Sequence, residues 1–131
     1  MNLPYILDDQ GNPVLCLDRA KQRAWSESPA SDQFRVGDEH IDGHWISTCL
    51  QPFDLEGEDG VESADPIVWE TMVFGPGEGM DVVWQDRCGG NRTNAVAMHA
   101  RAVTEIRRRI KQHDLLSEIC AVCEHRLTSH T

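Results

Sequence analysis

Two titratable residues, Glu70 and His99, stand in stretches of sequence that predict burial. Glu70 interrupts the run from Ile67 to Phe74, whose apolar residues fall on both faces of a strand and therefore predict a strand covered on both sides. His99 lies on the apolar stripe of a predicted helix, where an imidazole needs a hydrogen-bond partner. A buried carboxylate and a buried imidazole can satisfy each other across a helix and a sheet. We therefore expect Glu70 and His99 to pair.

Such a pair has two interpretations. As a structural pair it would satisfy two buried polar groups and fix the register of the helix on the sheet. We favour this interpretation because buried polar groups are normally hydrogen-bonded and mostly structural. As a site for ligand binding or proton transfer it would include Asp54, at the end of the preceding predicted strand, as a third member. The second interpretation predicts a small-ligand or metal-dependent enzyme or binder that uses Asp54, Glu70 and His99.

The cysteines could bind a metal ion. Cys120 and Cys123, followed by His125, have the spacing of half a zinc site, which Cys88 or His113 could complete. A structural zinc site usually draws a second close pair of ligands from elsewhere, and the sequence has none. Both cysteines also fall on the apolar side of a predicted helix, where Cys behaves as a small hydrophobe. We expect no cofactor and keep zinc as the alternative.

Acidic residues are concentrated in the middle of the chain. Residues 36–86 contain 13 Asp or Glu and no Lys or Arg, whereas residues 87–131 contain 4 acids and 8 bases, and the whole chain carries −10. A negative surface repels nucleic acid and attracts basic proteins, so we predict no general nucleic-acid binding and a partner with a basic surface. The predicted partner-binding residues belong to one connection between strands: Glu56, Glu58, Asp59, Glu62 and Asp65.

The patterns predict an α+β fold, an antiparallel four- to five-stranded meander sheet with one long helix packed on a face and a short C-terminal helix. A hairpin around Asp8–Pro13 comes first, and a short helix capped by Asp18 follows it. The predicted strands are 34–36, 43–53, 67–74 and 81–84. The long helix is predicted from Thr93, as its cap, to Lys111, and the short one from Asp114 to Glu124. At 131 residues the chain predicts a single domain, 1–131, with residues 111–131 as an extension.

The sequence also bears on location. The N-terminus has neither a basic start nor an apolar run, and no uncharged stretch approaches the ~18 residues of a membrane span. The five cysteines are an odd number at irregular spacing, which is typical of reduced thiols. We predict a cytoplasmic protein with no membrane partner.

Several different short motifs follow one another along residues 7–110. The first motif is at Asp8, Gly11 and Pro13, and the others lie around Thr48 and Asp54, then around Glu70, Thr71 and Met72, then at Ala95 with His99. In this order and spacing the chain resembles a family of small uncharacterised proteins encoded by tailed bacteriophages and prophages, whose pattern reads S-T-x5-D, F-E-T-M-x-F and A-x3-H. The chain departs from the family where Pro52 replaces the usual Gly, where Asp65 replaces the first of two prolines, and after Lys111.

The resemblance implies a phage origin and the meander with its helix, but no established activity. Together with the charge it favours an accessory protein of the host cell cytoplasm that binds a host protein. Such a protein could inhibit a host defence by imitating the charge of nucleic acid. We favour binding over catalysis because no catalytic motif is present. A structural or assembly role in the virion is a further alternative, although the sequence shows neither heptads nor repeats.

Overall fold

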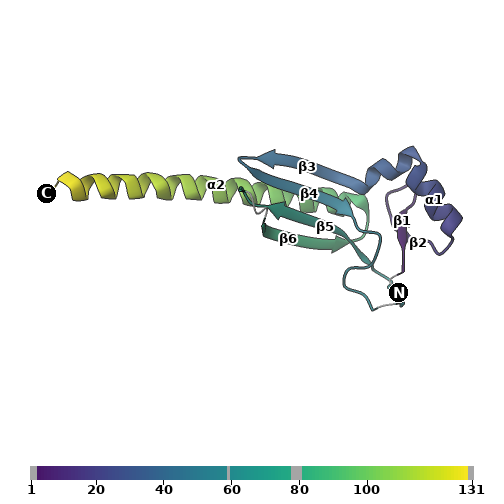
Figure 1. The fold of residues 1–131 in the computed structure, drawn as a ribbon. Coiled ribbons are helices and arrows are strands. Elements are labelled where there is room, and N and C mark those ends of the chain that lie inside the picture. The colour runs from purple at the N-terminus through teal and green to yellow at the C-terminus, as the bar shows by residue number, and fades with distance from the viewer. Residues whose placement is uncertain (1–2, 59, 78–80, 130–131) are drawn as a thin grey trace.

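A computed structural model describes the backbone of residues 3–58, 60–77 and 81–129, and the side chains of these ranges up to residue 119. The chain begins with a two-stranded sheet, β1 (Tyr5–Leu7) and β2 (Pro13–Leu15), followed by α1 (Arg19–Glu27) and a 3-10 helix, η1 (Pro29–Phe34). A four-stranded sheet then forms from β3 (Arg35–Ile41), β4 (His44–Leu50), β5 (Ile67–Phe74) and β6 (Val82–Gly89), and α2 (Arg92–Ser129) ends the chain. Figure 1 shows this arrangement, which confirms the predicted α+β fold.

The four-stranded sheet is an antiparallel meander with the order β3-β4-β5-β6. β3 extends to Ile41, well beyond the predicted end at Val36, because residues 42 and 43 form a tight hairpin turn. Asp42 and Gly43 both adopt positive φ, 50° and 82°, as the turn type that suits the twist of paired strands requires. The last strand likewise extends to Gly89 rather than ending at Trp84.

The core lies between one face of the sheet and α2 (Figure 1). Near the start of the helix, Trp69, Ala95 and Met98 belong to one buried cluster, to which β1 contributes Tyr5 and Leu7. Farther along, a second cluster is formed by Ile46, Val73, Ala102, Val103 and Ile106. These helical residues recur at three- and four-residue steps, so one stripe of α2 meets the sheet. The prediction that this helix covers a face of the sheet is confirmed.

α2 is one helix of 38 residues, which corrects the prediction of two. Neither Gly nor Pro occurs from Arg92 to Ser129, so nothing in the sequence interrupts the backbone hydrogen bonds at Asp114. At 1.5 Å per residue the helix is about 57 Å long. Figure 1 shows its C-terminal half projecting beyond the sheet. Among the described residues, no helix combines the length and the apolar character that a membrane span requires.

The start of α2 is fixed by the N-terminal hairpin. Asn91, not the predicted Thr93, caps the helix, since its Oδ1 accepts from the Thr93 amide at 2.8 Å. The Nδ2 of Asn91 donates to the carbonyl oxygen of Gln10 at 2.6 Å, and the Arg92 amide donates to the carbonyl oxygen of Gly11 at 2.8 Å. These bonds attach the first turn of α2 to the N-terminal hairpin, and the buried side chains of the helix then pack on the sheet.

Candidate functional site

His99 is the centre of a buried hydrogen-bond network between α2 and the sheet. Its Nε2 lies 2.8 Å from Oε1 of Glu39 on β3, and its Nδ1 lies 2.7 Å from the hydroxyl oxygen of Thr48 on β4. The side chain of His99 is almost entirely enclosed, as predicted. Its carboxylate partner is Glu39, however, so the predicted pairing with Glu70 is wrong.

The network continues from Thr48 to Thr71 on β5, whose hydroxyls are hydrogen-bonded. An ionised Glu39 only accepts hydrogen bonds, so Nε2 of His99 is the donor to it. With a neutral imidazole, Nδ1 then accepts from the Thr48 hydroxyl, and the Thr48 oxygen accepts from Thr71. A single direction of donation therefore satisfies all four side chains.

Gly37 makes room for the imidazole. A Cβ atom at position 37 would overlap the Cε1, Nε2 and Cδ2 atoms of the His99 ring. Gly37 stands opposite Thr48 and borders an irregularity in the pairing of β3 with β4, between Arg35 and Gly37. The ring thus lies against bare backbone, between its two hydrogen-bond partners.

Glu70 lies on the other face of the sheet. Successive residues of a strand point to opposite faces, and Thr71, the next residue, points toward Thr48 and His99. Glu70 is buried, as predicted, with 8% of its surface exposed. Its Oε2 accepts from Nε of Arg87 at 2.9 Å and from Nε2 of Gln85 at 2.7 Å, both on β6. The alternation of the strand thus separates the two residues that the sequence predicted to pair.

Asp54 does not join either group. Its Oδ1 accepts from the Ile67 amide at 3.0 Å and from the Glu56 amide at 3.2 Å. The carboxylate therefore holds the connection between β4 and β5 against the start of β5. The structure does not bring Asp54, Glu70 and His99 together in one site.

Glu39, His99 and Thr48 have the connectivity of an acid–histidine–hydroxyl triad. A nucleophile must reach its substrate, however, and the side chains of Thr48 and Thr71 are fully enclosed, with no exposed surface. The network therefore ties α2 to β3, β4 and β5 and does not present a reactive group.

The acidic connection between β4 and β5 lies at the end of the sheet where α2 begins, since Ile67 pairs with Gly89. Four of the predicted partner-binding residues are exposed, namely Glu56, Glu58, Glu62 and Asp65, and Asp59 lies outside the described residues. Asp42 and Asp81 lie at the opposite end of the strands, roughly 26 Å away for an eight-residue strand. The described acids thus lie at both ends of the sheet, with those of the connection at one end and Asp42 and Asp81 at the other.

The predicted zinc ligands are only partly within the described residues. The side chains of Cys120, Cys123 and His125 lie outside them. Cys88 is half-buried, and burial, followed by the charge of Asp86, raises the pKa of its thiol, which disfavours the thiolate that zinc binds. In the part of the chain with described side chains, no three His, Cys, Asp or Glu residues are arranged to hold a metal ion.

Sequence reasoning missed Glu39 and Gly37. The missed signal is Asp42-Gly43, a dipeptide typical of two-residue hairpin turns. That turn extends β3 to Ile41 and pairs Glu39 with the core residue Ile46, so that Glu39 faces α2. Thr48 was part of the family-like motif, but its role could not be inferred without the register.

Comparison with known proteins assigns the chain to no family. No protein-family model matches the chain. No curated protein and no solved structure matches it significantly.

Proposed function

We propose that the protein is a phage-encoded accessory protein that binds a basic surface of a host protein through its acidic connection. We define this connection as residues 55–65 and its acidic set as Glu56, Glu58, Asp59, Glu62 and Asp65. The basic surface would be one that normally binds nucleic acid, so that the protein acts as an anti-defence inhibitor or a similar competitor.

The exposure of the connection carries this proposal. Its four described acids all face solvent, and the segment contains no Lys or Arg that could neutralise them. The Leu55 amide donates to the carbonyl oxygen of Ile67 at 2.7 Å, and Asp54 caps the same end of β5, so the segment is anchored to the sheet. Exposed carboxylates on an anchored segment can present negative charge to a surface that binds phosphates.

The catalytic alternative lacks comparable support. Each of the three candidate residues already has hydrogen-bond partners within the protein. Glu70 accepts from Arg87 and Gln85, and Asp54 accepts from backbone amides. His99 bonds Glu39 and Thr48. A small-ligand site built on these residues would need them to share a cavity, whereas they lie on different faces and ends of the sheet.

Retention of host proteins from a lysate tests the proposal. The immobilised protein is expected to retain a nucleic-acid-binding protein at about 50 mM salt and to release it at about 500 mM, because exposed charge pairs are screened. The variant E56Q/E58Q/E62Q/D65N should lose this retention. The control D9N/E27Q/D32N/D81N removes the same charge from exposed residues elsewhere and should keep it.

The retained protein should then be tested with its own nucleic acid. We expect the wild-type protein to displace the nucleic acid and the E56Q/E58Q/E62Q/D65N variant to fail. Equal retention by both variants, or a retained protein whose nucleic-acid binding is unaffected, would contradict the proposal.

A further inference from the structure

The projecting half of α2 exposes large apolar side chains. Leu115, Leu116 and Ile119 leave 55%, 54% and 50% of their surface exposed, although each is large enough to contribute to a core. In proteins, most of the stability of a helix comes from the packing of its apolar face. Of the three, Leu115 lines a groove beside the helix, whereas Leu116 and Ile119 lie about 100° and about 40° farther around it. Leu115 therefore marks the side of α2 on which a partner can pack.

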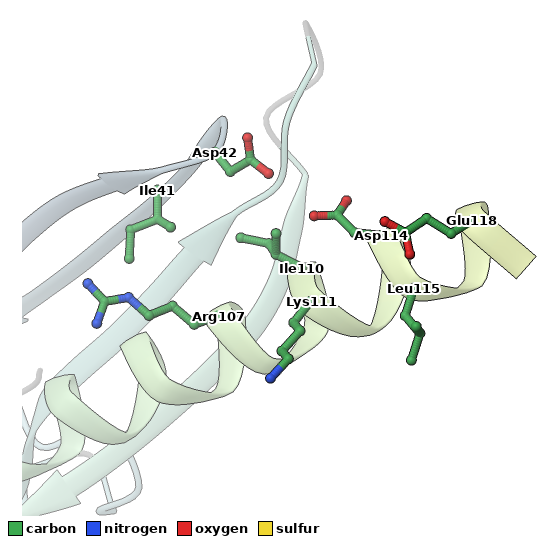
Figure 2. Close-up of a pocket in the computed structure, with 8 residues that line it drawn as sticks. All are labelled: Ile41, Asp42, Arg107, Ile110, Lys111, Asp114, Leu115 and Glu118. Atoms are coloured by element: carbon green, nitrogen blue, oxygen red, sulfur yellow. The ribbon is translucent and has the colours of Figure 1, made fainter.

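A groove marks where a partner can lie. It has a volume of about 510 Å³ and runs between the end of β3 and α2. Figure 2 shows its lining: Ile41 and Asp42 from the hairpin, and Arg107, Ile110, Lys111, Asp114, Leu115 and Glu118 from the helix. The groove is thus bordered by apolar side chains on both sides and contains charges of both signs.

The charges in the groove follow a definite order. Arg107, Lys111, Asp114 and Glu118 are spaced by four, three and four residues, so they lie within about 60° of one another around the helix. The two cations come first and the two anions follow. Within one helix, two of the three neighbouring pairs, Arg107–Lys111 and Asp114–Glu118, are like charges four residues apart, and one, Lys111–Asp114, is an opposite pair three residues apart. The like pairs outnumber the opposite pair, so the order is unfavourable within a single helix. Among the described residues, neither Arg107, Lys111 nor Glu118 has an ion-pair partner.

When the helix is read in the opposite direction, each positive position of this charge order coincides with a negative one. Arg107 lies as far before the midpoint between Gln112 and His113 as Glu118 lies after it, and Lys111 and Asp114 are related in the same way. In two antiparallel helices related by a two-fold axis at that midpoint, each cation faces an anion of the other copy. A parallel pair would place Arg107 against Arg107 and Glu118 against Glu118, which is repulsive.

We infer that this groove binds a second copy of the chain, with the two α2 helices packed antiparallel about a two-fold axis between Gln112 and His113. Leu115 flanks the charged stripe on one side and Ile110, with Ile41 of β3, on the other, so the partner's helix covers apolar surface on both sides. Long cationic side chains contribute their methylene groups to such contacts. The inference uses none of the residues of the acidic connection and is independent of the proposed function.

Sedimentation equilibrium of single and mixed variants tests both the dimer and its register. The wild type should have twice the 14.8 kDa mass of the monomer. R107E alone and E118K alone should each weaken dimerisation at least tenfold, because each homodimer contains two pairs of like charges. An equimolar mixture should recover dimers, since the glutamate at position 107 of one variant then faces the lysine at position 118 of the other.

Matched variants control for the effect of a change in net charge on dimerisation. The mixture of R107E with D114K should not recover, because position 107 faces position 118, not 114, in the proposed register. R19E and E27K make the same charge changes on α1 and should dimerise like the wild type. A monomeric wild type, dimers unaffected by R107E and E118K, or equal recovery in both mixtures would overturn the inference. Recovery of dimers in the mixture of R107E with E118K, but not in the mixture of R107E with D114K, would support the inference. It would also show that R107E and E118K fold.

Discussion

Gly37 of β3 lies against the imidazole of His99, so close that a methyl group at position 37 would occupy the space of the ring. The contact joins the first strand of the meander to a helix 62 positions later in the chain, counted from 37 to 99. His99 in turn bonds Glu39 of the same strand and Thr48 of the next. The position of α2 on the sheet therefore depends on a residue without a side chain.

Gly37→Ala is expected to destabilise the protein by about 1–3 kcal/mol, the usual cost of adding a methyl group to a filled core. Urea unfolding followed by circular dichroism measures this change. The ring must move away from Thr48 or Glu39 to admit the methyl group, so at least one hydrogen bond of the network is lost.

A double-mutant cycle with His99→Ala separates this contact from other effects. In the H99A background, the Cβ at position 37 has space, and G37A should cost much less than in the wild type. Equal costs in the two backgrounds would mean that Gly37 is needed for a reason unrelated to His99.

Thr48→Val is expected to cost more than Thr71→Val. The change at position 48 leaves Nδ1 of His99 without a donor in a buried site, which costs about 1–3 kcal/mol. The change at position 71 removes the end of the chain of hydrogen bonds and leaves Thr48 free to donate to His99, so we expect about 1 kcal/mol. The free energies of unfolding of the two variants give the comparison, and the reverse ranking would contradict the proposed direction of donation.

Arg87→Met should destabilise the protein more than the double change E70M/R87M. Removing Arg87 alone leaves the enclosed carboxylate of Glu70 with Gln85 as its remaining side-chain partner, at a cost of about 1–3 kcal/mol. Replacing both partners removes the buried charge and can be nearly neutral. Guanidinium unfolding at neutral pH distinguishes the two results. A double variant less stable than R87M would show that Glu70 has another necessary contact.

Glu105 should titrate far below an ordinary glutamate. Hydrogen bonds from Arg108, then Arg109, lower the pKa of its carboxyl from 4.5 to about 2. Because the folded-state pKa is depressed, the stabilisation is present above pH 4.5 and is lost as the pH falls from 4.5 toward 2. NMR titration of the side-chain carboxyl measures the value directly.

Arg108→Gln provides the control for this titration. It removes the donors at 3.1 and 2.7 Å and should raise the pKa of Glu105 toward 4.5. Because Glu105 and its partners are near the surface, high salt should have a similar, weaker effect. An unchanged titration in R108Q would mean that Arg109 alone lowers the pKa.

The sequence by itself determined the secondary-structure types, the meander and the burial of Glu70 and His99. Each of these follows from local pattern: alternation in the strand, three- and four-residue spacing in the helix, and turn residues between them. The Asp18 cap is an example, since its side chain accepts from the amides of Ala20 and Lys21 as predicted. The end of β3 was predictable too, had the Asp42-Gly43 turn been recognised.

Only the tertiary structure decided which buried groups meet. The phase of β5 places Glu70 and Thr71 on opposite faces, and a shift of one residue would have exchanged them. The choice of Glu39 for His99 depends on the register of β3 with β4 and on the rotation of α2, to which the core packing of the helix and its bonds to the N-terminal hairpin both contribute. Register and rotation are set by contacts between distant segments, so local pattern predicts that a polar group is buried but not its partner.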